Sequence, residues 1–128
     1  MSTLAFVVVA IVALGPAYVV VTGGHAETDE AIDFFSDGER VVPIPGPRHS
    51  EGAAHGSGCT HSAALAAHLA LGFDPLEAAV AAKAVASAAV RDGLRDVGAG
   101  PGPVDALGIR AGAARPVEDA GRARTPLA

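Results

Sequence analysis

The sequence of 128 residues is poor in aromatic side chains, with four Phe, one Tyr and no Trp. A chain of this length suits one domain and can bury on the order of two-thirds of its unfolded surface. Because aromatic rings are too few to fill such a core, it must be built from Val, Leu, Ile and Ala. Side chains of that size favour helices that lie close on strands.

Cysteine and basic residues are scarce as well. The single cysteine excludes an internal disulfide framework. It leaves a buried structural thiol or a reactive one, and it favours a reducing, cytoplasmic location. The formal net charge is −5 and no basic stripe is visible, which argues against nucleic acid as a partner.

Charge is absent from the first 24 residues, where Leu4–Val21 forms an apolar run at the lower length limit for a membrane helix. A signal peptide is a second possibility, although a basic n-region is lacking. Gly15-Pro16 divides the run, however, because proline breaks a helix. We therefore expect core segments rather than a membrane segment: a short helix or strand over Leu4–Leu14, then a buried parallel strand over Ala17–Thr22.

A hairpin is predicted after this strand. Asp37-Gly38 is a strong turn signal between two strand-like runs, Ile32–Ser36 and Arg40–Ile44. Three prolines follow at positions 43, 45 and 47, which indicates an edge strand that leaves the sheet. Residues 46–56 then read as a polar loop that contains glycine.

Two helices come next. The first is expected from near Gly58 to a C′ glycine at Gly72. The second has Asp74 as N-cap, Pro75 at the first helical position and Glu77 three residues after the cap. Its mostly alanine body, from residue 76 to about residue 91, can pack closely. A glycine-proline loop spans 97–107, and residues 108–128 are expected to be a flexible tail or linker outside a domain over 1–107. This order predicts a three-layer α/β unit with ligands at the carboxyl ends of its strands.

The stretch "HGSGCT", residues 55–60, carries the chemistry. Gly56 and Gly58 allow a ligand to approach the backbone closely. The free N–H groups of the first helical turn form an anion site at the positive end of the helix dipole. Cys59 lies in that field and is a candidate thiolate base or nucleophile, and Thr60 adds a hydroxyl donor. The alternative is a glycine-rich loop before a core helix, with Cys59 packed as a small apolar side chain.

Other kinds of site have weaker support. The stretch is not a Walker A loop, because Gly-Lys-Ser/Thr is absent. His61 and His68 lie roughly 10 Å apart along one helix at 1.5 Å per residue, too far to chelate one metal ion. One cysteine and scattered histidines do not indicate a zinc site.

The order "VVVTGGH", hairpin, "HGSGCTHSAALAAHLALG", "DPLEAAVAAKAVASAAVRDGL" and "GPGPV" resembles the C-terminal half of hydroxymethylpyrimidine/phosphomethylpyrimidine kinases. These enzymes of thiamine biosynthesis belong to the ribokinase-like superfamily, so the resemblance implies a truncated three-layer ribokinase-like α/β fold. It implies ATP-dependent phosphoryl transfer to hydroxymethylpyrimidine or its phosphate, with Mg²⁺ bridging the phosphates. The anion hole, with Cys59 at the catalytic position, would consist of Gly56, Ser57, Gly58 and Cys59. The cofactor-binding positions would be Thr22, Gly23, Gly24, His25, Thr60 and Gly102.

The chain also departs from the pattern of these kinases. Ala53-Ala54 replaces the usual Asn-Thr, Pro101 stands in place of a histidine, and Thr22 replaces a frequent lysine. The N-terminal half, which supplies most of the pyrimidine pocket and much of the dimer contact, is missing. Two alternatives therefore stay open: a non-catalytic nucleotide-binding remnant and a pyridoxal kinase-like protein. The expected partners are a small-molecule substrate and either a homodimer mate or a polypeptide that supplies the N-terminal half.

Overall fold

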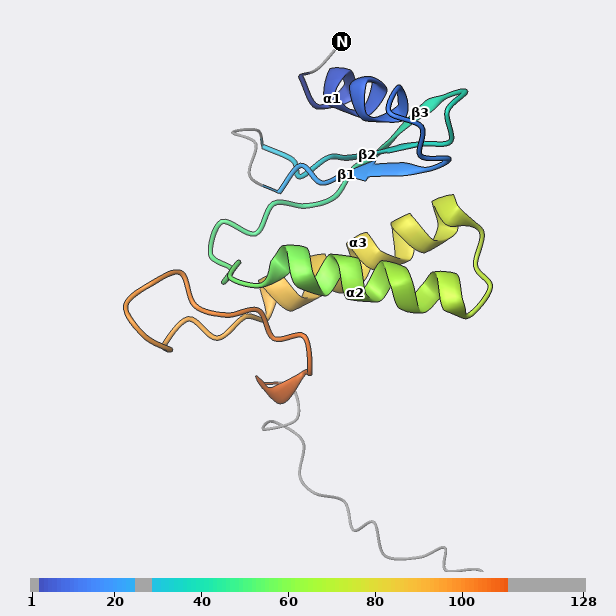
Figure 1. Ribbon diagram of the computed structural model, residues 1–128. Helices are drawn as coiled ribbons and strands as arrows, with labels where there is room; N and C mark the ends of the chain where they lie inside the picture. The colour runs from blue at the N-terminus through green and yellow to red at the C-terminus, as the bar shows by residue number, and fades with distance from the viewer. Residues whose placement is uncertain (1–2, 25–28, 111–128) are drawn as a thin grey trace, which may run out of the picture.

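The computed structural model describes residues 3–24 and 29–110 as three layers. Figure 1 shows helix α1 on one face of a small sheet and the paired helices α2 and α3 on the other. The elements, in chain order, are α1 (Thr3–Val12), β1 (Val19–Val21), β2 (Asp33–Ser36), β3 (Val41–Ile44), α2 (Ser57–Ala70) and α3 (Pro75–Arg91). The three-layer α/β arrangement expected from the sequence is confirmed.

The sheet has the order β1-β2-β3 and is antiparallel throughout. Phe35 of β2 lies opposite Val20 of β1 and opposite Val42 of β3. This corrects the predicted parallel strand over Ala17–Thr22, because the described residues pair β1 only with β2, in the antiparallel sense. An apolar run indicates burial but not the direction of the neighbouring strand, and here only Val19 of the strand is buried.

The hairpin turn forms where it was predicted. The Oδ1 atom of Asp37 accepts hydrogen bonds from the N–H groups of Glu39 and Arg40, and Gly38 adopts a positive φ of 89°. Pro43 lies within β3, which is an edge of this sheet, so its missing N–H costs no ladder bond.

The core is made of small and aliphatic side chains around one aromatic ring. Phe35, Ile44 and Ala79 are buried together, and four partly buried side chains pack against them: Val20, Val42, Leu65 and Leu76. Ala78, Ala79 and Ala82 are fully covered. These alanines let α3 lie close on its neighbours, as the composition predicted.

The helix ends follow the sequence signals. Asp74 caps α3 by accepting the Leu76 N–H at 3.0 Å, with Pro75 as the first helical residue. Leu71 caps the end of α2, and Gly72 follows with a φ of 88°. Helix α1 has ten residues and buries only Ala5 and Val8. Within residues 3–24 and 29–110, no helix is long and apolar enough to cross a membrane. Most of the predicted tail, residues 111–128, lies outside the described residues.

The cap of α3 gives a first prediction. Asp74→Ala removes the acceptor for the Leu76 N–H and should lower the free energy of unfolding by about 1 kcal/mol. Urea unfolding followed by circular dichroism measures the change. Asp96→Ala, which removes an exposed acid from a loop, is the control and should stay within about 0.5 kcal/mol of wild type. Equal effects of the two substitutions would contradict the capping role.

Candidate functional site

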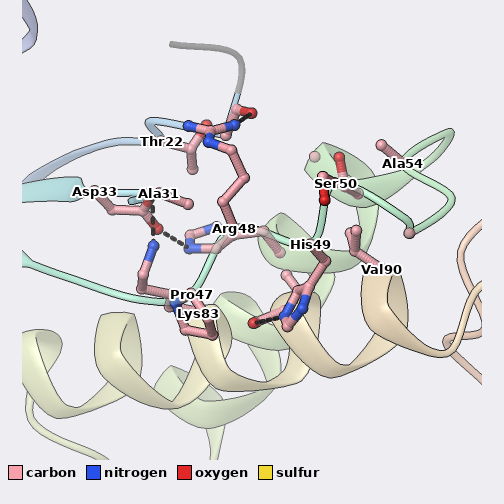
Figure 2. A pocket seen from close by; sticks show the side chains of 17 residues that line it. Thr22, Ala31, Asp33, Pro47, Arg48, His49, Ser50, Ala54, Lys83 and Val90 are labelled. Atoms are coloured by element: carbon pink, nitrogen blue, oxygen red, sulfur yellow. Dashed lines mark hydrogen bonds and ion pairs between the residues drawn. The ribbon is translucent and has the colours of Figure 1, made fainter. Parts of the chain in front are cut away.

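A pocket of about 320 Å³ lies between the end of β1, the segment after β3, the start of α2 and the inner face of α3. This volume is within the range of small-molecule sites. Figure 2 shows the side chains that line it, among them Asp33 of β2, Lys83 of α3, and the neighbouring Arg48 and His49 of the segment after β3. Four of the predicted site residues are among the lining residues: Thr22, Gly24, Ser57 and Gly58. The fold therefore brings the "TGG" and "GSG" segments to one cavity.

The start of α2 offers hydrogen-bond donors to this pocket. Gly56 is the N-cap with a φ of 89°, a left-handed conformation that favours glycine, and it makes no side-chain cap. Among the described residues, the N–H groups of Gly58 and Cys59 have no acceptor, because the bonds around them run from Ser57 to Ala54 and from Thr60 to Gly56. Free N–H groups at the positive end of a helix, here one of 14 residues, are donors of the kind that bind anions.

Five other predicted residues do not line the pocket: Gly23, Gly56, Cys59, Thr60 and Gly102. Cys59 is exposed on α2. The Thr60 hydroxyl donates to the Gly56 carbonyl oxygen at 2.9 Å, so the helix start already uses that donor. Gly102 accepts the His55 N–H at 3.1 Å, which holds the 102–104 loop against the start of α2. Their roles in binding or catalysis stay predictions, and His25 lies outside the described residues.

The two glycines after β1 have different tasks. A Cβ on Gly23 would collide with the carbonyl oxygen of Ile32, so the chain needs glycine there for packing. The Gly23 N–H donates to Oδ1 of Asp33 at 2.9 Å. Gly24 faces open space and lines the pocket, and its carbonyl oxygen accepts Nη1 of Arg48 at 2.8 Å.

Buried charged side chains form a part of the site that was not predicted. Nζ of Lys83 lies 3.0 Å from Oδ1 of Asp33, and both side chains are about nine-tenths buried or more. Nε2 of His61 lies 3.7 Å from Oδ2 of the same carboxylate. An acid inside the apolar run "AIDFFS" and a lysine among the alanines of α3 were the available signals. A charge in a segment that is otherwise apolar indicates a buried partner.

The surroundings of His61 oppose its protonation. Burial lowers the pKa of His61, and the positive charge of Lys83 lowers it further, while the carboxylate of Asp33 works in the opposite direction. The imidazole is therefore neutral near pH 7. A neutral histidine between a carboxylate and an ammonium group is sensitive to any change in either partner.

The pair Gly23 and Gly24 gives a second prediction. Gly23→Ala should lower the free energy of unfolding by about 1–3 kcal/mol, because the new methyl group meets the Ile32 carbonyl. Gly24→Ala is the matched control and should change stability by less than about 0.5 kcal/mol. Thermal and urea unfolding of the two variants decide between a packing role and a ligand role for Gly23.

The pKa of His61 gives a third prediction. Since the folded pKa lies below the unfolded value of about 6.5, the unfolded chain binds more protons at pH near and below 6.5. The His61 contribution therefore makes the protein less stable as the pH falls through this window. His61→Gln should weaken this pH dependence between pH 7.5 and 5.5, and His68→Gln should not. Urea unfolding of wild type and both variants at each pH gives the free energy of unfolding. An equal loss of stability in all three proteins as the pH falls would contradict the role of His61.

Comparison with known proteins identifies the family. The family model described as phosphomethylpyrimidine kinase matches residues 3–105. The hydroxymethylpyrimidine/phosphomethylpyrimidine kinase of Rhizobium meliloti (strain 1021) is 46% identical over 96 residues, which cover 74% of this chain and 36% of the relative. The pyridoxine kinase of Bacillus subtilis (strain 168) is 41% identical over 81 residues, 62% of this chain and 30% of the relative.

The solved structures that share this fold are also kinases. The pyridoxal kinase of Staphylococcus aureus in complex with AMP-PCP and pyridoxal superposes with a TM-score of 0.73 at 33% identity, over 77% of this chain and 37% of that one. An ADP complex of Bacillus subtilis pyridoxal kinase gives a TM-score of 0.71 at 37% identity, over 78% and 38%. The chain thus spans about a third of the length of the curated relatives it matches. On the sequence match and the shared fold, the chain belongs to the phosphomethylpyrimidine kinase family.

Proposed function

We propose that this chain forms the phosphate-binding side of an ATP-dependent kinase that phosphorylates hydroxymethylpyrimidine or its phosphate. The observation that carries the proposal is the start of α2, where Gly58 lines the pocket and the N–H groups of Gly58 and Cys59 lack acceptors among the described residues. Preorganised donors of this kind stabilise the charge that develops on a transferring phosphoryl group. Among the pocket's lining residues, Arg48 and Lys83 outweigh the one carboxylate of Asp33, which also favours an anionic ligand.

The proposed roles follow from position. Gly56, Ser57 and Gly58 form the anion hole, and Thr22 and Gly24 line the path of the nucleotide from the end of β1. Cys59, on the exposed side of the same helix turn, is the base that takes the proton of the acceptor hydroxyl as ATP supplies the phosphoryl group. A single exposed thiol with this task fits a reducing cytoplasm.

Magnesium would be held mainly by the nucleotide. Asp33 already accepts bonds from the Gly23 N–H and from Lys83, and the described residues contain no group of three side chains suited to a metal ion. Mg²⁺ commonly keeps several waters and binds through substrate phosphates, where it neutralises charge. The residues present therefore fit a nucleotide that brings its own cation.

A pyridoxal kinase-like activity is the second candidate for the substrate. The relatives include kinases named for pyridoxine and pyridoxal as well as kinases named for hydroxymethylpyrimidine. All of these substrates offer a hydroxymethyl group on a nitrogen heterocycle, so the same phosphate side serves both. Measurement of turnover with each alcohol distinguishes them.

A role as a binding part that acts with a partner polypeptide has its own support. Apolar side chains are exposed around the first helix and strand: Phe6 (63%), Val9 (47%), Leu14 (84%) and Tyr18 (55%). Strand β1 also has one edge without a strand neighbour in the described part of the chain. A segment that corresponds to the remaining two-thirds of the relatives would cover this surface and supply the substrate side.

The base assignment gives a fourth prediction. Cys59→Ala should lower turnover at least about 100-fold, the usual contribution of a general base, and should leave the Kd for ATP within about twofold. Calorimetry gives the Kd, and a coupled assay of ADP release gives turnover, with the chain alone and with added N-terminal segment of a relative. Ser62→Ala, an exposed substitution on the same helix, is the control.

Three outcomes separate the candidates. ATP binding with turnover by the chain alone supports a kinase that is complete in this chain. ATP binding with turnover only after the N-terminal segment is added supports the binding part with a partner. Absence of ATP binding in both preparations would overturn the proposed nucleotide site.

A further inference from the structure

The carboxylate of Asp33 connects three elements around the pocket. It accepts the N–H of Gly23, which follows β1, at 2.9 Å and contacts Nζ of Lys83 on α3 at 3.0 Å. Both of these contacts use Oδ1, whereas Oδ2 has Nε2 of His61, on α2, 3.7 Å away. Figure 2 shows Asp33 and Lys83 facing each other at one end of the pocket. Asp33 therefore has one close cationic partner, Lys83, and a second neighbour, His61, that lies just beyond hydrogen-bonding distance.

His61 is unsatisfied in this arrangement. Its side chain is 7% exposed, and its Nε2 atom has no hydrogen-bond partner among the described residues. Buried polar atoms nearly always have a partner, so an orphaned nitrogen that lines a pocket calls for an explanation. A shift of roughly 1 Å would bring Nε2 to the distance of a charge-assisted bond with Oδ2.

Lys83, in contrast, lies where it can pair either with Asp33 or with an anion at the start of α2. It is the only lysine of the chain, and it lines the pocket together with Ser57 and Gly58 at the start of α2. Its stem passes over Gly46, where a Cβ would lie 2.7 Å from Cε of Lys83, so glycine leaves the space that the long side chain uses. The other cation of the lining, Arg48, is bonded to backbone carbonyl groups of Gly24 and Glu30. An anion at the start of α2 would attract the ammonium group of Lys83.

We propose that a phosphate-bearing ligand in the pocket draws Lys83 away from Asp33, and that His61 takes up a proton and replaces Lys83 as the partner of Asp33. The inference rests on the proposed function, since a nucleotide phosphate is the anion invoked. The step balances in charge: Lys83 pairs with the phosphate, and the new imidazolium pairs with the carboxylate. The proton comes from the acid form of the buffer. Nucleotide binding is thus coupled to proton uptake at His61.

The electrostatic surroundings support this exchange. Burial is the largest cause that lowers the pKa of His61, and Lys83 lowers it further, whereas Asp33 raises it. Removal of the lysine charge takes away one of the two causes that oppose protonation and leaves Asp33 as the charged neighbour, which shifts the balance toward the imidazolium form. The remaining charged or titratable groups of the pocket lining are Arg48 and His49, and His49 is bonded to Oγ of Ser87 on α3 at 2.8 Å.

Calorimetry of MgADP binding to the full chain tests the coupling. At about pH 6.5, close to the ordinary pKa of histidine, titrations in two buffers of different ionisation enthalpy give the protons taken up per nucleotide. Wild type should take up more protons than His61→Gln, by a difference of up to about one proton. His68→Gln, two turns along the same helix, and His49→Gln, in the segment after β3, should behave as wild type.

Two results would overturn the inference while leaving the proposed function intact. One is nucleotide binding with equal proton uptake by wild type and His61→Gln. The other is loss of the uptake in His49→Gln, which would assign the proton to His49. Failure of wild type to bind MgADP in any buffer would instead overturn the proposed function.

A second measurement needs no nucleotide. Lys83→Met mimics the withdrawal of the lysine, so the pKa of His61, followed by the NMR shift of its ring protons, should rise relative to wild type. An unchanged or lower pKa in Lys83→Met would overturn the exchange. If this variant does not fold, Lys83→Gln removes the same charge and keeps a polar end group, and the same rise is expected.

Discussion

The buried carboxylate of Asp33 is the contact on which the pocket depends. It joins the end of β1 through Gly23, the body of α3 through Lys83 and the first turns of α2 through His61. These three pieces and the segment after β3 form the pocket wall, and without the carboxylate the Gly23 N–H and the Lys83 ammonium group would each lose a buried partner. Removal of one member of a buried ion pair typically lowers the free energy of unfolding by about 3–5 kcal/mol, which is a large part of the total for a small domain.

The proposed anion site at the start of α2 depends on backbone rather than on side chains. Gly56 gives the left-handed N-cap, no side chain caps the helix, and the N–H groups of the following turn stay available. A serine or aspartate cap would occupy these donors. The helix therefore gives up a stabilising cap at the place where the proposed function needs donors for a phosphate group.

Local features of the fold could be predicted from the sequence because their signals lie within a few residues. The hairpin at Asp37-Gly38, the cap at Asp74 and the glycine end at Gly72 all appear as expected. The direction of β1 could not be predicted, since three valines read the same beside a parallel or an antiparallel neighbour. The resemblance singled out two glycine segments, and the fold brings residues of both to one pocket.

The buried charged side chains of the pocket could not be predicted from the sequence, for a different reason. Asp33 and Lys83 are fifty positions apart, and only the packing of α3 on the sheet brings them within 3.0 Å. His61 looked like one of two histidines spaced along a helix, and its burial was not visible in the sequence. Gly23 was read as a ligand-binding glycine, whereas its packing against Ile32 requires glycine even without a ligand.

The geometry around Asp33 also constrains how relatives of this chain can diverge. Loss of Lys83 alone leaves a buried carboxylate without its cation, and loss of Asp33 alone leaves a buried ammonium group, so neither position can drift freely. His61 changes this constraint, because a histidine next to the carboxylate offers a replacement cation on the same side of the pocket. A lineage that carries histidine here has an accessible mutational path through the loss of the lysine, and one with an apolar residue at this position does not. The residues at positions 33, 61 and 83 are therefore expected to vary together among relatives.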